Sequence, residues 1–165
     1  MNAHIRPAMT QDLPGLLSIY NEAVLNTTAS YDYEPTTLTA RTAWFEAKQA
    51  QQLPVFVAEE AGRVLGWSSF GAFRAWIGYR FTVEHSVYVD ANCRGQGIGR
   101  QLVLPLIDAA RQRGLRAMIA GIDADNVVSQ RLHASLGFEQ VAHFKQVGYK
   151  FDRWLDLLFM ELLLA

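Results

Sequence analysis

The sequence predicts a single domain of mixed α/β class, and three observations carry this prediction. The 165 residues are enough for one sizeable core, and half of them are hydrophobic. Strand-like and helix-like segments follow one another in the order β-α-α-β-β-β-α-β-α-β-β, with no internal repeat, low-complexity tract or linker. A segment with three closely spaced glycines, residues 94–100, follows a strand at residues 82–89, and a helical series begins within it at Ile98. One domain is therefore expected over residues 1–165.

The first half of the chain predicts a strand, two helices and a β-hairpin. Residues 4–7 form a short strand, and Thr10 caps a helix whose apolar stripe begins at Leu13. The polar loop that follows this helix is too rich in turn formers to be a strand. The later elements are a helix over 37–52, a strand over 55–58, a turn at 61–63 and its partner strand over 64–73.

The second half predicts three strands and two helices after the central strand. Residues 82–89 are rich in β-branched and aromatic side chains, which suit a half-buried pleated surface. Gly114 ends the helix that starts at Ile98, and Gly137 ends a shorter helix. The elements expected after residue 114 are a buried strand over 117–122, a helix over 126–136 and two closing strands over 146–150 and 154–164.

Composition excludes several classes of partner. The formal net charge is -1, which offers no electrostatic reason to expect nucleic acid or a membrane surface. Cys93 is the only cysteine, so no intramolecular disulfide can form and a reducing compartment is the simplest setting. The N-terminus shows no signal-peptide pattern, and the most apolar stretch, residues 157–165, is too short to span a bilayer. We expect a cytoplasmic protein.

The glycine segment at residues 94–100 is typical of an anion site. Bare N–H groups in a glycine turn approach an anion closely, and the positive end of the following helix dipole adds to the attraction. The segment lacks the Gly-Lys-Ser/Thr ending of a nucleoside-triphosphate loop and the Gly-x-Gly-x-x-Gly spacing of a dinucleotide fold. Taken alone, these glycines mark only a tight turn.

In context, the pattern Arg94-Gly-x-Gly-x-Gly after Val87-Tyr88-Val89 resembles the acyl-CoA pyrophosphate loop of the GCN5-related N-acetyltransferase (GNAT) superfamily. Matching blocks across the chain resemble its phosphinothricin acetyltransferase branch: Ile5-Arg6, Asp12, Ile19-Tyr20-Asn21, Glu34-Pro35, Thr82-Val83-Glu84, Leu132-His133, Leu136-Gly137 and Gly148-Tyr149-Lys150. The runs at 84–87 and 150–156 are most similar to members that act on methionine sulfoximine and methionine sulfone. The resemblance implies a seven-stranded, mostly antiparallel mixed sheet flanked by helices. It also implies a splay between strands 4 and 5 and a bulge in strand 4.

The resemblance also implies that acetyl-CoA is the co-substrate and that no metal is needed. The donor-binding residues carried over are Val87, Tyr88, Val89, Arg94, Gly95, Gln96, Gly97, Ile98, Gly99, Arg100, Asn126 and Ser129. Backbone groups of residues 87–89 would hold the pantetheine arm, and the 95–100 turn the pyrophosphate. Asn126 would also hold the pantetheine arm, although a helix N-cap explains this residue equally well.

Glu84 is the candidate general base. An amine is mostly ammonium at neutral pH and must lose a proton before it attacks a thioester. A carboxylate serves this purpose directly or through water, and partial burial would raise its pKa usefully. The alternative is an ordinary surface carboxylate. Strict alternation puts Glu84, Ser86 and Tyr88 on the face opposite Val87 and Val89, unless a bulge changes the parity.

His133 is the second catalytic candidate. Asn126, Ser129 and His133 share one face of the predicted helix. In many superfamily members a tyrosine at this position protonates the departing thiolate, and a histidine can do the same or act as a base. The alternative is a satisfied core histidine. His85 is more typical of packing, although the resemblance places it near the substrate.

The acceptor is expected to be a small amino-acid-like amine. Arg74 would hold a carboxylate through a two-pronged hydrogen bond, and Tyr31, Trp76 and Tyr79 would wall the pocket. Glu84, His85 and Ser86 complete the predicted acceptor site. Core packing for the aromatic residues and a solvated loop charge for Arg74 are the alternatives. Trp76 departs from the herbicide-acetylating pattern, which has a basic residue there; this favours a sulfone or sulfoximine side chain over a phosphinic acid.

The sequence therefore predicts an acetyl-CoA-dependent transfer of acetyl to the α-amino group of a methionine sulfoximine, methionine sulfone or phosphinothricin type of compound. Two alternatives stay open: acetylation of another amine such as a peptide or drug, and a non-catalytic acyl-CoA sensor. The resemblance implies a homodimer, to which the apolar C-terminal strand would contribute.

Overall fold

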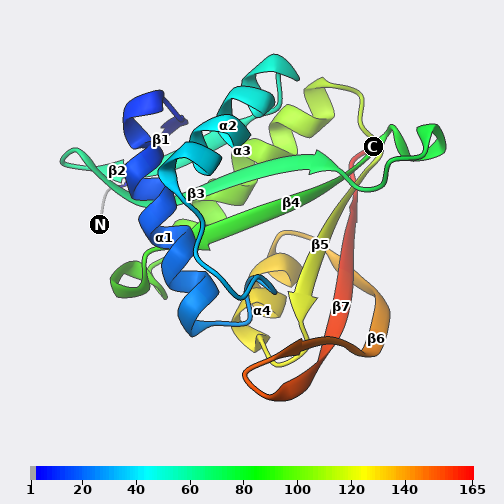
Figure 1. Cartoon of the computed structure of the whole chain (residues 1–165). Helices are drawn as coiled ribbons and strands as arrows, with labels where there is room; N and C mark the ends of the chain where they lie inside the picture. The colour runs from blue at the N-terminus through cyan, green and yellow to red at the C-terminus, as the bar shows by residue number, and fades with distance from the viewer. Residues whose placement is uncertain (1–2) are drawn as a thin grey trace.

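The computed structural model describes residues 3–165 of the chain (Figure 1). The strands are β1 (His4–Pro7), β2 (Val55–Glu60), β3 (Arg63–Ala72), β4 (Thr82–Val89), β5 (Ala117–Asp123), β6 (Glu139–Lys150) and β7 (Arg153–Leu163). The helices are α1 (Leu13–Asn26), α2 (Leu38–Ala50), α3 (Ile98–Gln112) and α4 (Val127–Ser135). The predicted order of elements is confirmed.

Within the described residues the strands form one seven-stranded sheet in the order β1-β2-β3-β4-β5-β7-β6. All neighbouring strands are antiparallel except β4 and β5, which are parallel. Helices α1 and α2 cover one face, where Leu16 and Phe45 pack on Val57 and Trp67. Helix α3 covers the other face, with Leu102 against Leu65. The expected seven-stranded, mostly antiparallel sheet flanked by helices is therefore confirmed.

The sheet divides between β4 and β5. Only three residue pairs join these strands, from Thr82↔Ala117 to Glu84↔Ile119. Beyond them β4 stays paired with β3, β5 stays paired with β7, and the two halves diverge into a V that is plain in Figure 1. The backbone groups of residues 85–89 and 120–123 that face the splay therefore do not pair with each other. Buried backbone N–H and C=O groups need a hydrogen-bond partner, so a ligand or water is expected to satisfy them. The predicted splay is confirmed.

The predicted cap at Thr10 is wrong. Thr10 lies in a short 3₁₀ helix, Thr10–Asp12, and α1 begins at Leu13 with Asp12 at its N-cap position. The Asp12 carboxylate accepts from the N–H of Met9 at 2.7 Å and from the Arg6 guanidinium at 2.7 and 2.9 Å. The charge of Arg6 gives this carboxylate a stronger partner than a threonine hydroxyl would have. This pair holds Asp12 at the N-cap position, one residue before α1 begins.

Two further expectations need correction. Strands β3 and β4 pair in continuous register from Gly66↔Val89 to Ala72↔Val83, so the bulge that the resemblance implied in β4 is absent from these residues. Strict alternation therefore holds along β4. The closing strand expected over 146–150 is the end of β6, which begins at Glu139 and follows β7 through two register shifts. Those irregularities interrupt the period-two pattern and hid the first half of the strand.

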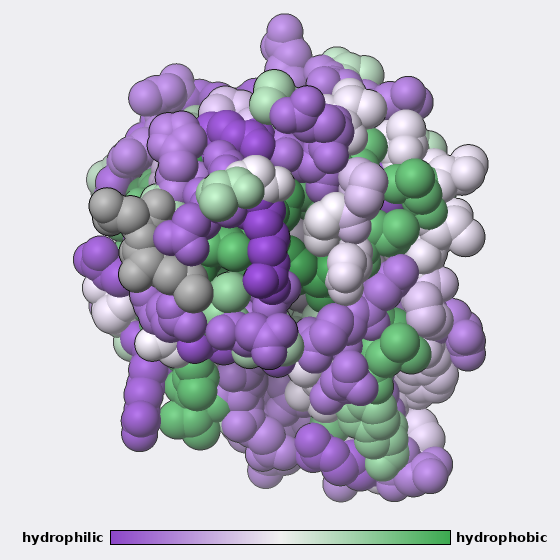
Figure 2. Space-filling view, turned by 90° about the vertical axis from the view of Figure 1, so that its left-hand side faces the viewer, coloured by the Kyte–Doolittle hydropathy of each residue, from purple (hydrophilic) through white to green (hydrophobic). Residues whose placement is uncertain are grey.

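No helix within residues 3–165 is long and apolar enough to cross a membrane. The face near the N-terminus, at the left of Figure 1, is predominantly hydrophilic, and its hydrophobic residues appear as separate small groups (Figure 2).

Candidate active site

A groove of about 990 Å³ lies where β4 ends and the glycine turn begins. The start of α4 and the loop after α1 form its other walls. The predicted donor residues in these walls are Val87, Tyr88, Val89, Arg94, Gly95, Gly97, Ile98, Gly99, Asn126 and Ser129. Gln96 and Arg100 belong to the same turn but not to the walls.

The glycine turn leaves N–H groups at the start of α3 for a ligand. Gly95 and Gly97 have φ of +76° and +81°, left-handed values that side chains rarely adopt. Gly97 is the N-cap residue of α3, and no side chain caps this helix end. The first N–H groups of the helix thus lack an intrahelical acceptor, and the dipole favours negative charge there. This arrangement suits a phosphate group.

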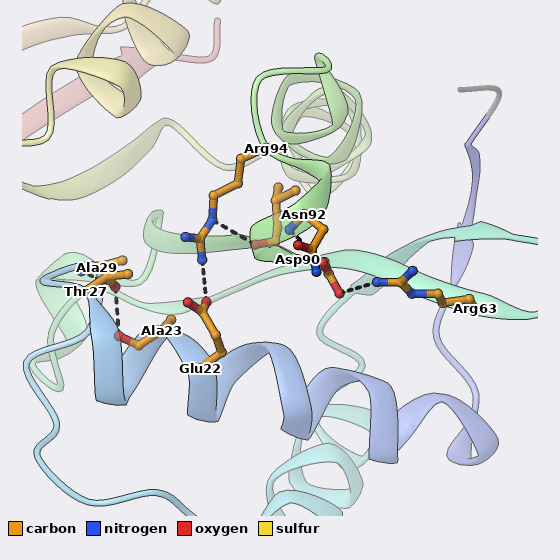
Figure 3. A network of polar contacts seen from close by, with 9 residues as sticks. Glu22, Ala23, Thr27, Ala29, Arg63, Asp90, Asn92 and Arg94 are labelled. Atoms are coloured by element: carbon orange, nitrogen blue, oxygen red, sulfur yellow. Dashed lines mark hydrogen bonds and ion pairs between the residues drawn. The ribbon is translucent and has the colours of Figure 1, made fainter.

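Arg94 is tied to α1 across the edge of the groove (Figure 3). Its guanidinium forms an ion pair with Glu22 at 2.5 Å, and its Nε donates to the carbonyl of Val89 at 3.2 Å. Nearby, Asp90 pairs with Arg63 at 2.8 Å and accepts from the N–H of Asn92. These contacts hold the segment between β4 and the glycine turn. A role for Arg94 in binding a phosphate therefore requires that it share its charge with Glu22.

A second cavity of about 440 Å³ occupies the splay itself. It shares Val87, Tyr88, Asn126 and Ser129 with the groove, so the two spaces adjoin. The predicted residues that line it are Tyr31, Glu84, His85, Ser86, Val87, Tyr88, Asn126, Ser129 and His133. The fold brings together both catalytic candidates and most of the donor residues on either side of one opening.

Glu84 lies at the point where β4 and β5 part. Its Oε1 atom is 3.0 Å from the position that a Cβ on Gly121 would occupy, so the carboxylate leans toward β5. Burial raises the pKa of Glu84, and the positive charge of Arg74 opposes this rise. A carboxylate with a raised pKa in a partly desolvated cavity is a stronger base than an exposed one.

His133 has partners for both ring nitrogens. Its Nδ1 donates to the carbonyl of Ser129 at 2.7 Å, and its Nε2 lies 2.9 Å from Nε2 of His85. Burial lowers the pKa of His133 and lowers that of His85 to about 3, so both rings are neutral near pH 7. Neutral His133 therefore carries its proton on Nδ1 and accepts from His85. It reaches a thiolate only if the contact with His85 breaks.

Asn126 combines the two roles considered for it. It is the N-cap residue of α4, and its Oδ1 accepts from the N–H of Ser129 at 3.1 Å. It also lines both the groove and the splay cavity. The cap uses only the side-chain oxygen of Asn126. The amide nitrogen therefore remains free to donate a hydrogen bond to a ligand in the groove at the end of β4, which we call the donor groove.

The predicted acceptor residues are only partly brought together. Tyr31 lines the splay cavity with its hydroxyl buried and without a partner in the described residues, and the missing side chain of Gly148 makes room for its ring. Burial raises its pKa to about 12. Arg74, Trp76 and Tyr79 lie on the exposed segment between β3 and β4, outside the cavity walls, with Trp76 69% exposed. The charge of Arg74 nevertheless acts on Glu84.

A third cavity of about 360 Å³ begins at the same residues of β4 and extends beneath α2. Glu84, Ser86 and Tyr88 form one wall, and Arg41 and Lys48 of α2 form another. Within residues 3–165 no group of three or more histidine, cysteine or acidic side chains is arranged to hold a metal ion.

Comparison with known proteins shows to which family a chain with this splayed sheet and glycine turn belongs. Residues 16–138 match the acetyltransferase (GNAT) family, which is well over half of the chain. The chain belongs to the GNAT family of acetyltransferases.

Three relatives place this acetyltransferase more closely. It is 52% identical over 163 residues to the L-methionine sulfoximine/L-methionine sulfone acetyltransferase of Pseudomonas paraeruginosa, covering 98% of this chain and 95% of that protein. The phosphinothricin N-acetyltransferase of Alcaligenes faecalis is 38% identical, covering 95% of this chain and 80% of that protein. The structure of yncA, a putative acetyltransferase from Salmonella typhimurium with its cofactor acetyl-CoA, superposes with a TM-score of 0.97. It is 48% identical and covers 100% of this chain and 95% of that one.

Sequence reasoning missed several residues in or beside the candidate site. Gly121 and Arg41 carry no local motif: a glycine within a strand and an arginine on an amphipathic helix have ordinary explanations. Lys150 is almost fully buried, and its ammonium donates to the carbonyls of Thr27 and Ser30, which holds the loop after α1 against β6. A partial signal for Lys150 was its place in one of the matching blocks.

Proposed function

We propose that this acetyltransferase transfers acetyl from acetyl-CoA to the α-amino group of a small amino-acid analogue of the methionine sulfone, methionine sulfoximine or phosphinothricin type. The observation that carries the proposal is the position of Glu84, which borders both the splay cavity next to the donor groove and the cavity beneath α2. A base in this position can deprotonate an acceptor amine that lies next to a thioester bound in the splay.

In the proposed reaction Glu84 takes a proton from the acceptor ammonium, directly or through water. The amine nitrogen then attacks the thioester carbonyl carbon and the C–S bond breaks. The nitrogen loses its second proton as the amide forms, and the departing CoA sulfur takes up that proton, directly or through water, to become a thiol. Backbone N–H groups of β4 that β5 leaves unpaired would polarise the thioester carbonyl. The acetyl-CoA pyrophosphate would lie on the turn between Arg94 and Arg100.

His133 enters the proposal with a condition. Both of its nitrogens have partners within the protein, so direct proton transfer to the thiolate requires separation from His85. Its position between Ser129 and His85 equally supports a role in holding the start of α4 beside the donor. Arg74 would bind the acceptor carboxylate after a movement of the exposed β3–β4 segment. Trp76, Tyr79 and Tyr31 would pack around the acceptor.

The relatives' names support the acceptor class, since two of them act on compounds with an α-amino group beside a polar side chain. We further propose a homodimer, because exposed aromatic residues such as Phe151 and Trp154 gather at the β6–β7 turn, and a cytoplasmic site of action, where the buried thiol of Cys93 stays reduced.

Thiol release from acetyl-CoA, measured with a panel of amino acids, sulfones, sulfoximines, peptides and amine drugs, tests the proposal. We expect the highest kcat/KM with methionine sulfone or methionine sulfoximine. Preferential turnover of peptides or drugs would contradict the acceptor class. Thermal stabilisation by acetyl-CoA without turnover of any amine would instead indicate a non-catalytic sensor.

A further inference from the structure

The cavity beneath α2 is lined by aromatic rings, by the two cations Arg41 and Lys48, and by the carboxylates of Asp32 and Glu84. Trp67 stacks on Tyr88 with ring centroids 4.9 Å apart, and Trp44 meets Trp67 edge-on at 5.3 Å. Arg41 and Lys48 lie among these rings, and Glu84 closes the side toward the splay. An apolar wall with a few converging polar groups is typical of a small-molecule site.

Arg41 is a buried cation without an ion-pair partner. Arg41 is 7% exposed, its Nε atom makes no hydrogen bond, and no carboxylate within residues 3–165 lies within 4.0 Å of it. Burial lowers its pKa, and the Tyr20 hydroxyl and the more distant charge of Asp32 oppose this lowering. Its guanidinium carbon lies 4.3 Å from the ring centroid of Tyr20 and 4.7 Å from that of Trp44. Cation–π contacts and the Tyr20 hydroxyl offset part of the desolvation, but they leave the Nε–H donor unused. Buried charges are ordinarily paired, so this donor points to an absent anion or oxygen acceptor.

Lys48 brings a second cation to the same cavity. Its Nζ donates to the carbonyl of Phe70 at 2.8 Å, which uses one of its three protons. The same atom lies 3.1 Å from the position of a Cβ on Gly71. Gly71 is directly opposite Glu84 in the ladder, and opposed residues project from the same face of a sheet. The ammonium of Lys48 therefore lies on the face of the sheet that carries the candidate base.

We propose that Arg41 and Lys48 form a subsite for an acceptor group that presents two oxygens on one centre, as a sulfone or a carboxylate does. This inference rests on the proposed function and extends it to the acceptor's oxygens, either those at its side-chain end or, in place of Arg74, those of its α-carboxylate. With the amine at Glu84, the methylene chain packs against Tyr88, Trp67 and Trp44, and the oxygens take the free donors of both cations. A bidentate contact suits the planar fork of Arg41, and Lys48 adds a point charge.

The test compares KM values for four acceptors: methionine sulfone, methionine sulfone amide, norleucine and norleucine amide. They differ in whether they carry the sulfone group and in whether they carry a free α-carboxylate. Lys48→Met and Arg41→Met are measured beside the surface controls Lys145→Met and Arg131→Met, and thermal unfolding verifies that each variant folds. Lys48→Met is the decisive variant if Arg41→Met does not fold, since Arg41 also packs on three rings.

If the subsite holds side-chain oxygens, we expect Lys48→Met and Arg41→Met to raise KM for both sulfones roughly tenfold or more, as the loss of a charge-assisted hydrogen bond implies. KM for norleucine and acetyl-CoA would stay within about twofold. If the subsite holds the α-carboxylate, KM rises for both free acids and not for the amides. Either pattern supports the shared chemistry. Unchanged KM values for all four acceptors in both variants would overturn it.

Failure of the proposed function would be seen separately, as absence of thiol release by the wild type with every acceptor. Calorimetric binding of methionine sulfone then tests the subsite by itself. Binding that Lys48→Met weakens and Lys145→Met preserves would support the subsite. Equal affinity for both variants, or no binding by the wild type, would overturn it.

Discussion

The carboxylate of Glu84 lies over Gly121 on the opposite side of the splay, with 3.0 Å between Oε1 and the position of a Cβ on residue 121. The nearest ring atom of Phe159 is 3.6 Å from the same position, so residue 121 has little room on either side. The glycine thus provides the space in which the candidate base is held. Gly121 can provide this space because it lies just beyond Ile119, the last residue of β5 that pairs with β4.

Adding one methyl group at this position is expected to displace the base. Gly121→Ala would push the flexible carboxylate away, and a shift of about 1 Å in a reacting group costs up to roughly 10²-fold in rate. Stability should change little, because alanine is tolerated in a strand with ordinary φ. Steady-state kinetics and thermal unfolding measure the two effects. Gly78→Ala, where no heavy atom lies within 4 Å of the added methyl, is the matched control. Full activity in Gly121→Ala would show that the carboxylate position is not critical.

Glu84→Gln removes the candidate base with little change of shape. We expect kcat to fall by roughly 10²–10⁴, with partial recovery at alkaline pH, where more of the acceptor is free amine. The pH–rate profile of the wild type should lose activity as the pH falls through the raised pKa of Glu84, and the variant should lack that limb. Unchanged turnover in the variant would exclude Glu84 as the base.

The same substitution has a predicted effect on stability. Because burial raises the pKa of Glu84, its contribution to stability is fully present below the unfolded pKa and is lost as the pH rises through the folded pKa. Glutamine stays neutral throughout. We therefore expect Glu84→Gln to unfold at a higher denaturant midpoint than the wild type at about pH 8, and the difference to shrink toward about pH 4. A lower midpoint at the alkaline end would contradict the desolvation of Glu84.

The histidine pair has a different pH signature. Burial lowers the pKa of both His85 and His133, so in mild acid the unfolded chain binds protons at these residues more readily than the folded chain does. Stability should decline as the pH falls below about 6.5, by up to about 1.4 kcal/mol per pH unit for each histidine. Long-range ¹H–¹⁵N spectra should show His133 as the Nδ1–H tautomer, and His85→Gln should reduce the slope of stability against pH. A charged imidazolium at pH 6 would refute this assignment.

Arg74 should act on the acceptor rather than the donor. Arg74→Ala is expected to raise the acceptor KM by about tenfold, the loss expected for a charge-assisted hydrogen bond, and to leave the KM for acetyl-CoA unchanged. Arg80→Ala in the same segment is the control, since its guanidinium lies over the Phe81 ring. An unaltered acceptor KM in Arg74→Ala would remove Arg74 from the site and leave Arg41 as the stronger candidate.

Much of the fold could be predicted because its signals are local. The alternation in residues 82–89 and the glycines at 95 and 97 specify a strand, a left-handed turn and a helix start whatever surrounds them. The errors arose where distant partners intervene. Asp12 pairs with Arg6, so Thr10 does not cap α1, and two register shifts in β6 conceal the periodicity of its first half.

The candidate site also has features that the sequence could predict and features that it could not. Glu84 and the glycine turn could be proposed from the sequence because one continuous segment carries them in the order that resembles a known family. The buried and unpaired state of Arg41 could not, since the same arginine on an exposed helix face would have an identical sequence signature. The neutral histidine pair joins residues 48 positions apart, and the space for the Glu84 carboxylate comes from a glycine on another strand.

The sequence by itself thus determined the class of fold and the glycine turn, because short-range periodicity and glycine conformation act within a few residues. The resemblance of its motifs to a known family supplied Glu84 as candidate base and acetyl-CoA as candidate ligand of that turn. Tertiary structure alone decided how that base is surrounded: the splay opposite Gly121, the tautomer of His133 and the unpaired charge of Arg41. These properties depend on desolvation and on contacts between separate strands and helices, and both arise only when the chain is packed.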